Sequence, residues 1–182
     1  MRVEITGAAE LIADFEAMPG KVQRASIRAM NRAIASGRTV MVRAIAQDVG
    51  IKSTDVRTAL RMREASVARP TAELAASLKR IPLMKFNARQ TTRGGVSYKL
   101  RGGRGRLPQA FIRTMRSGHT GVFTREPGAK RLPIREHFGP SLGRVFAKYR
   151  GVALLRAKLA FEKNFDHELD FQRSQVSGGG AD

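Results

Sequence analysis

The chain has 182 residues and a formal net charge of +19, and its length suits one domain with a hydrophobic core. It contains no cysteine, which excludes disulfide bonds and cysteine nucleophiles. No apolar run approaches the roughly 20 residues that cross a bilayer, and the first residues lack the regions of a signal peptide, so we expect a protein made in a reducing cytoplasm without a membrane contact. Residues 51–150 carry 23 Lys and Arg against five Asp and Glu, which predicts one concentrated positive surface facing a polyanion.

The N-terminal part of the chain is predicted to be helical. A first helix is expected at residues 7–18, closed by Pro19 and Gly20. A long helix is expected at residues 21–48, because apolar residues recur there at steps of three and four and align along one face. This broad face suits packing against two neighbours at once, the second being the sheet or another subunit. Its central members are Ile27, Met30, Ile34, Gly37, Met41 and Ile45.

A helical corner is expected at residues 45–63, where Gly50 lies in a turn and a short helix follows at 54–63. The pattern resembles a helix-turn-helix, which would place the residues from Thr54 to Thr58 in a major groove. The other reading is an ordinary corner in which Gly50 adopts the left-handed conformation. Asp55 is poorly placed beside phosphate at the start of the second helix, which favours the ordinary corner.

The most unusual segment is the basic, glycine-rich stretch 85–106, which holds seven Lys and Arg, five Gly and no acidic residue. Residues 96–101 alternate as in a strand, with Val96, Tyr98 and Leu100 on one face, and the flanks are expected to be flexible loops. Cations on glycine-rich loops fit a phosphate backbone without reading base sequence, and a solvated loop is the alternative. The candidate nucleic-acid-binding residues are Arg89, Arg93, Lys99, Arg101, Arg104 and Arg106.

Short strands separated by tight turns are expected around this segment. One strand is predicted at residues 71–79, between two prolines. Three more are predicted at 110–115, 119–125 and 132–136, where Gly- and Pro-containing turn dipeptides separate short apolar runs. Together they predict a small, mainly antiparallel sheet.

A second long helix is expected at residues 141–173, followed by a flexible tail at 175–182. Its acidic and aromatic end fits the basic surface of a neighbouring copy, in head-to-tail contacts that close into a ring; a solvated helix end is the alternative. The predicted core side of the helix carries Leu142, Val145, Tyr149, Val152, Leu155 and Leu159. The candidate subunit-interface residues are Phe161, Phe165, Asp166, Glu168 and Asp170.

No catalytic constellation is visible in the sequence. The histidines His119, His137 and His167 occur singly, and no two of them lie at metal-ligand spacing with a supporting carboxylate. The glycines at 102–105 lack the Lys-Ser/Thr ending of a phosphate-binding loop. We therefore expect no enzyme activity, no catalytic residues, no bound metal and no cofactor.

A series of short motifs resembles the minor tail protein Z family of lambda-like tailed phages and prophages. The resemblance covers about residues 20–170, and its most specific parts lie in the second half of the chain. The motifs are the corner at 45–52, the strand ending at 81–83, the Val-Ser-Tyr segment at 96–98, and the runs 108–112, 121–125, 132–134 and 138–142.

The resemblance implies an α+β protein with a single tail-completion domain at 1–174, in which a long N-terminal helix and a C-terminal helix pack on the small sheet. It implies a structural virion protein at the head-proximal end, or neck, of the tail, made in the bacterial host cytoplasm and needed for head–tail joining and DNA passage. The implied partners are further copies in a hexameric ring, the tail terminator, tail tube or head-completion proteins, and viral double-stranded DNA. The DNA-facing role of 85–106 is inferred from charge alone.

Two other functions stay open at this point. A DNA-binding regulator would use the corner at 45–63, form a dimer and discriminate between sequences. An accessory protein would instead use its basic surface to contact an acidic partner protein.

Overall fold

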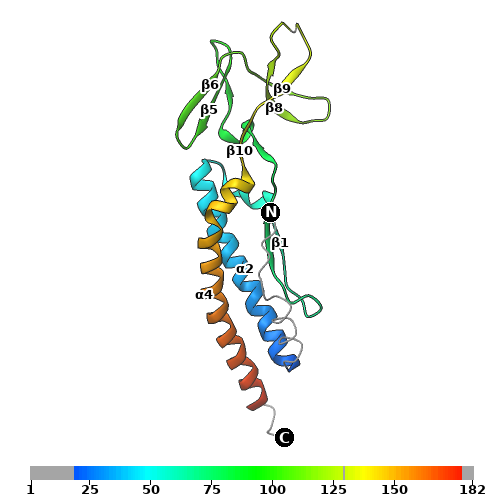
Figure 1. The fold of residues 1–182 in the computed structure, drawn as a ribbon, viewed down its shortest axis with the longest axis vertical. Helices are drawn as coiled ribbons and strands as arrows, with labels where there is room; N and C mark the ends of the chain where they lie inside the picture. Colours follow the sequence, from blue (N-terminus) through cyan, green and yellow to red (C-terminus); the bar gives the residue numbers. More distant parts are fainter. Residues whose placement is uncertain (1–18, 129, 178–182) are drawn as a thin grey trace. The chain divides into compact units, whose positions relative to one another are not determined.

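The computed structural model describes residues 19–128 and 130–177, as two long helices and four small antiparallel sheets (Figure 1). Helix α2 spans Gly20–Val49 and helix α4 spans Leu142–Ser177. The predicted α+β class and both long helices are confirmed. The helix predicted at 7–18 lies outside the described residues. The tail expected from residue 175 is helical up to Ser177, because α4 continues to that point.

The chain groups into two compact units, each built from separated segments. Unit 1 comprises 1–42, 60–76 and 149–182, and unit 2 comprises 43–59 and 77–148. Both long helices contribute residues to both units, and each unit is described by itself below. The prediction of a single domain at 1–174 stays a prediction.

In unit 1, α2 and α4 approach closely through small residues. Ala25, Ala29 and Ala33 of α2 and Ala153 of α4 are buried. A Cβ added at Gly37 would lie 3.0 Å from the Ala153 carbonyl oxygen, so the absence of a side chain at Gly37 lets the helix backbones meet. The stripe of small residues thus sets the distance between the two helices.

A β-hairpin completes unit 1. Strand β1 (Leu60–Arg63) pairs antiparallel with β2 (Glu73–Ala76), and the Asn31 side chain of α2 holds the end of β1. The Asn31 amide donates to the Ala65 carbonyl at 3.0 Å and accepts from the Ala65 N–H at 2.7 Å. The helix predicted at 54–63 is therefore wrong in its last four residues, because pairing with β2 and contact with α2 override the local helical pattern.

The predicted core side of α4 is wrong in its central part. Val152, Leu155 and Leu159 are 56%, 60% and 52% exposed, whereas Ala153 is only 6% exposed. The side of α4 that faces α2 carries small and polar residues instead. These are Ala153, Ala157, Ala160, Asn164 and Glu168.

The centre of unit 2 is a short connection between two paired strands. Strand β3 (Arg80–Pro82) pairs with β10 (Phe138–Ser141), and the 3₁₀ turn η1 (Leu83–Phe86) follows β3. The Phe86 side chain is fully buried, and its ring packs so tightly on Gly139 that an added Cβ there would collide with it. Phe86 is therefore a core residue of unit 2.

The segment predicted as a strand with flexible flanks forms a complete three-stranded sheet. Strand β4 (Arg89–Gln90) pairs with β5 (Val96–Leu100), which pairs with β6 (Gly103–Leu107). The strand itself is confirmed, but the flanks are ordered, because their backbone groups form the ladders on both sides of β5.

A second three-stranded sheet lies in the same unit. Strand β7 (Phe111–Thr114) pairs with β8 (Thr120–Arg125), and β8 pairs with β9 (Ile134–Glu136). All three strands were predicted within two residues of their bounds. The expectation of one sheet is wrong, since the strands of the described residues form four sheets of two or three strands.

Candidate nucleic-acid interface

The positive charge of the chain is concentrated in unit 2. This unit contains 20 Lys and Arg but only four Asp and Glu, whereas unit 1 contains 14 against 11. Unit 2 therefore carries a formal charge of +16 out of +19. Such a field attracts polyanions at a distance and weakens as salt is added.

Three of the four carboxylates of unit 2 form ion pairs within the unit, and the fourth, Glu136, contacts a histidine. Asp55 pairs with Lys85 at 2.7 Å, and Glu136 pairs with His119 at 2.8 Å. Glu126 lies 4.0 Å from Arg135. Asp48 pairs with two cations, Arg101 and Lys148. Among the described residues of unit 2, these contacts engage four Lys and Arg, and most of the other basic side chains are exposed to solvent.

The sheet β4–β5–β6 places four basic side chains on one face. Residues directly opposite in an antiparallel pair point to the same side of the sheet. Ser97 of β5 lies opposite both Arg89 and Arg106, and Lys99 lies opposite Arg104. Ser97 and Lys99 are two residues apart on one strand, so all of these side chains share one face. We call this face, defined by Arg89, Lys99, Arg104 and Arg106, the cationic sheet face.

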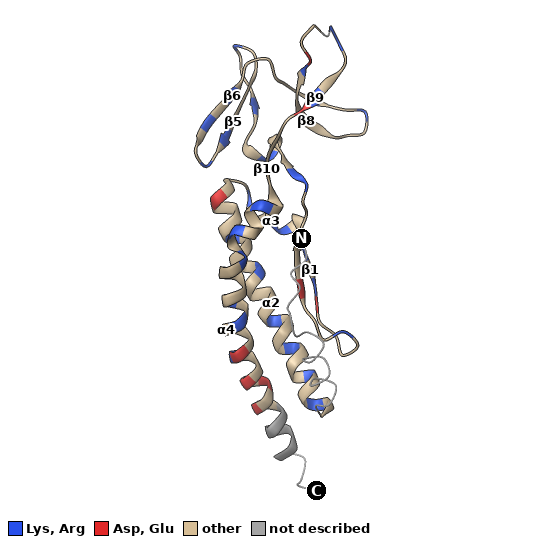
Figure 2. Ribbon diagram, viewed as in Figure 1, with Lys and Arg blue, Asp and Glu red and all other residues tan. Residues whose placement is uncertain are grey.

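The other face of this sheet is apolar and supports the cationic sheet face. Val96 is fully buried there, and the Tyr98 ring lies across Gly105, where an added Cβ would be only 2.3 Å from the ring. All four basic side chains are exposed on the opposite side. Neighbouring cations are spaced by roughly 7 Å along a strand and about 5 Å across strands. The array thus presents closely spaced charge without a base-reading element. Figure 2 shows basic residues on both β5 and β6.

Arg93 and Arg106 belong to the turn that joins β4 to β5. The Arg106 guanidinium donates to the Gly94 carbonyl at 2.9 Å and to the Arg93 carbonyl at 3.3 Å. Gly95, with a φ of +82°, lies against the backbone of Leu107. Arg106 therefore braces the turn, while the exposed Arg93 side chain stands at its tip.

Arg101 has a different environment from the other five candidates. It follows β5 in the turn to β6, and its guanidinium pairs with Asp48 at the end of α2. Asp48 also pairs with Lys148 of α4 at 3.0 Å. The Asp48 carboxylate thus joins three segments of unit 2, which gives Arg101 a role in holding the turn.

The second sheet carries cations that the sequence patterns did not single out. The Arg125 guanidinium lies 4.7 Å from the centre of the Phe111 ring, in a cation–π contact. The Phe111 ring in turn lies 6.2 Å from that of Phe123. Arg113 shares this face, since Arg113 pairs with Gly121 and Phe111 with Phe123. Only the strand register reveals that these cations lie together.

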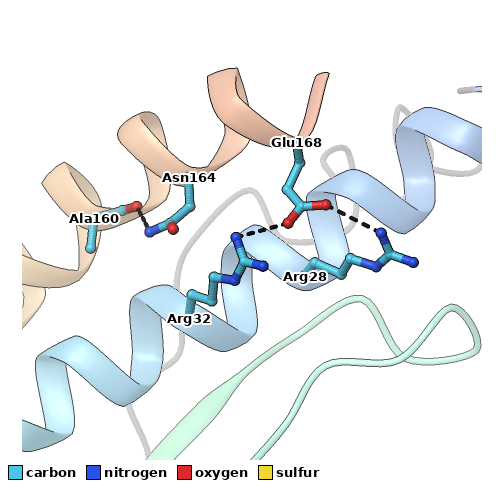
Figure 3. Close-up of polar contacts among 5 residues, drawn as sticks. All are labelled: Arg28, Arg32, Ala160, Asn164 and Glu168. Carbon is cyan, nitrogen blue, oxygen red and sulfur yellow. Dashed lines mark hydrogen bonds and ion pairs between the residues drawn. The ribbon is translucent and has the colours of Figure 1, made fainter. Parts of the chain in front are cut away.

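The candidate interface residues of α4 do not all lie in the same environment. Phe161 and Phe165 stack on each other, with ring centres 5.5 Å apart. Asp166 and Asp170 are exposed. Glu168 is 3% exposed and pairs with Arg28 and Arg32 of the same chain (Figure 3). The Glu168 carboxylate is therefore already occupied within unit 1, and the interface role of this set stays a prediction.

The corner at 45–63 has an ordinary structural explanation. Helix α3 spans only Ser53–Ala59, and Asp55 in its first turn pairs with Lys85. Gly50 has a φ of +79°, which the corner reading requires. Strand β1 follows α3 directly, so the chain leaves the helical pattern where a recognition helix would continue.

The described residues show no arrangement typical of a metal site. His137 contacts the Thr124 hydroxyl at 2.9 Å, and His119 contacts Glu136. Within residues 19–128 and 130–177, no cluster of three His, Asp or Glu side chains could hold a metal ion. The helices described there also lack a stretch long and apolar enough to span a membrane.

Comparison with known proteins identifies the family. A model of the family described as prophage minor tail protein Z (GPZ) matches residues 5–176. The chain belongs to this family. It is therefore a phage tail protein with a structural role, which is not an enzyme class, and the resemblance seen in the motifs is confirmed. No curated protein and no solved structure matches the chain.

Proposed function

We propose that this minor tail protein acts as a tail-completion component at the head-proximal end of the tail. Several copies form a ring, and unit 2 of each copy faces the DNA that passes during head–tail joining. The observation that carries this proposal is the concentration of +16 in unit 2 together with the cationic sheet face.

Physical considerations support a contact with the phosphate backbone and not with bases. The cationic sheet face consists of exposed Lys and Arg side chains, which displace counterions from DNA irrespective of its sequence. A channel component must let DNA slide, so a contact that fixes one sequence would oppose its function. Membership of a tail protein family and a smooth positive surface therefore point to the same role.

Salt-dependent DNA binding tests the DNA-facing part of the proposal. We would measure fluorescence anisotropy of two 30-base-pair duplexes of unrelated sequence between 50 and 300 mM KCl. Replacing Arg89, Lys99 and Arg104 by Gln should lower the slope of log K against log salt by about 2 to 3, because each lost phosphate contact contributes roughly 0.9. The two duplexes should bind equally.

A matched control removes the same charge from unit 1. Arg24, Arg61 and Arg63 are exposed there, and their replacement by Gln should leave the slope unchanged. An equal loss in both triple variants would mean that net charge alone drives binding and would remove the sheet from the proposal. Strong preference for one duplex would instead favour the regulator that uses the corner at 45–63.

Location in the tail requires a separate measurement. Tails assembled without this protein would be incubated with the purified chain and imaged by negative-stain electron microscopy. The proposal expects added density with ring symmetry at the head-proximal end, and recovery of joining to filled heads. Density at the distal tip, or along the tube, would overturn the assigned location.

A further inference from the structure

Helix α4 has an apolar stripe on the side that does not face α2. Val152, Leu155 and Leu159 recur at steps of three and four residues, so they lie on one face of the helix. All three are more than half exposed. The same stripe continues into Glu162 and Asp166, which are exposed and form no hydrogen bond or ion pair with any described residue.

The spacing of these apolar residues is typical of a buried helix face, but the residues are exposed. A helix that packs on one neighbour only has one apolar face and one polar face. In unit 1, α4 already contacts α2 through Ala153, Gly37 and Glu168. An exposed apolar stripe beside the face that is buried against α2 is typical of an element that packs on two neighbours, and exposed apolar patches of this kind mark protein contacts.

Unit 2 offers a surface with the opposite charge and an apolar edge. A pocket of about 380 Å³ is lined by Arg80, Pro140, Ser141 and Arg144. Both guanidinium groups are exposed and without an ion-pair or hydrogen-bond partner among the described residues. Leu78, 66% exposed, lies next to the pocket residue Ser141, because its carbonyl accepts from the Ser141 hydroxyl at 3.1 Å, and its side chain packs on Gly143.

We infer that the stripe of α4 in one copy docks on the Arg80–Arg144 pocket of a second copy. Leu155 and Leu159 would cover Leu78 and the pocket, while Glu162 and Asp166 would meet the two free guanidinium groups. Apolar contact and charge complementarity then coincide, with two carboxylates for two cations. The two surfaces differ, so the contact is heterologous and repeats from copy to copy, as a ring requires. This inference rests on the proposed oligomeric ring and assigns its contact surfaces.

Single-cysteine cross-linking tests the contact directly, because the chain has no cysteine of its own. Leu159→Cys and Leu78→Cys variants, distinguished by a size tag, would be oxidised alone and mixed, in solution and on tails that lack the protein. The inference expects a mixed dimer only in the mixture. A chain with both cysteines should give a ladder of larger products.

A control cysteine separates specific docking from random collision. Val67 is 55% exposed in the turn between β1 and β2, so Val67→Cys is as accessible as the other two positions but lies outside both surfaces. It should cross-link with neither. A Leu159→Cys homodimer would mean that α4 pairs with itself and would overturn the head-to-tail contact, as would the absence of the mixed dimer both in solution and on tails.

Charge reversal gives a second test, which remains informative even if one of the variants does not fold. Glu162→Lys with Asp166→Lys should reduce the mixed cross-link at least tenfold, and so should Arg80→Glu with Arg144→Glu. Combining the reversed stripe on one copy with the reversed pocket on the other should restore it. No recovery would overturn the assigned pairing. Tail imaging with the wild-type chain reports separately on the proposed function. Density at the head-proximal tail end without the mixed cross-link would refute only the contact between α4 and the pocket. The mixed cross-link without that density would refute the location in the tail.

Discussion

Arg32 of α2 donates to the Glu168 carboxylate of α4 across 2.8 Å, which ties the two long helices of unit 1 together (Figure 3). Arg28, one turn earlier, reaches the other carboxylate oxygen at 3.3 Å. The Glu168 side chain is 4% exposed, whereas both guanidinium groups are about half exposed. One buried carboxylate thus depends on two partners from the facing helix.

Replacing Glu168 by Gln should lower the free energy of unfolding by about 1–2 kcal/mol. The substitution keeps the shape but removes the charge that strengthens both hydrogen bonds, and solvent screening at the arginines limits the loss. Urea unfolding followed by far-ultraviolet circular dichroism measures it. Glu162→Gln, on the exposed side of the same helix, should change stability by less than about 0.5 kcal/mol. An equal effect of the two variants would show that the Glu168 ion pairs add nothing.

Two helical glycines should respond oppositely to alanine. At Gly151 an added Cβ meets nothing within 4 Å, so Gly151→Ala should raise the free energy of unfolding by about 0.5–1 kcal/mol through helix propensity. At Gly37 the Cβ would lie 3.0 Å from the Ala153 oxygen and 3.3 Å from the Ala157 Cβ. Gly37→Ala should therefore lower stability by about 1 kcal/mol, since separating the helices outweighs the propensity gain. Thermal unfolding of both variants decides; stabilisation by Gly37→Ala would contradict the close approach.

Alanine substitutions at the two glycines of the turn before β5 distinguish the cost of backbone strain from the cost of a steric collision. Gly94 and Gly95 both have positive φ, +76° and +82°, so alanine is strained at either position by about 1 kcal/mol. Only at Gly95 would the Cβ collide with backbone, at 2.5 Å from the Leu107 oxygen. We expect Gly95→Ala to cost at least about 2 kcal/mol more than Gly94→Ala. Hydrogen exchange of the β5 and β6 amides would show where the loss occurs, and equal protection in both variants would refute the tight contact.

We expect Arg101 to contribute to stability and Arg104 to contribute to DNA binding. Arg101→Gln removes one of the two cations that pair with Asp48 and should lower stability by about 0.5–1 kcal/mol, because Lys148 remains and the Arg101 side chain is 61% exposed. Arg104→Gln should leave stability unchanged but reduce the salt slope of DNA binding by about 1. Unfolding curves and anisotropy titrations on the same two proteins test both statements. A larger loss of DNA binding in Arg101→Gln would reverse the assignment.

Local patterns predicted much of the fold because the physical causes are local. The long helices follow from apolar residues at three- and four-residue steps, and the β7–β9 strands follow from turn dipeptides between short apolar runs. The helix predicted at 54–63 is wrong from Leu60 onward, and the cause lies elsewhere in the chain. Strand β1 forms because β2 supplies its backbone partners, and Asn31 holds Ala65 just beyond its end. No pattern within 54–63 contains that information.

The candidate nucleic-acid interface was likewise predicted only in part from the sequence. Charge alone nominated six basic residues in 85–106. Strand register decided that Arg89, Lys99, Arg104 and Arg106 share one face. The approach of the β5–β6 turn to the end of α2 decided that Arg101 pairs with Asp48. The cations at Arg113 and Arg125 escaped notice, because their grouping depends on pairing across β7 and β8. Register is set by long-range pairing, which residue spacing does not report.

The sequence by itself determined the helices, the family and the concentration of positive charge in the middle of the chain, since each depends on residue type and order. Only the tertiary structure decided which face of α4 is buried. The periodic leucines predicted a core at Leu155 and Leu159, yet the small residues at Ala153 and Gly37 allow closer contact between the helix backbones. Periodicity shows that a face is apolar; which apolar face the chain buries depends on the shape of the surface that it meets.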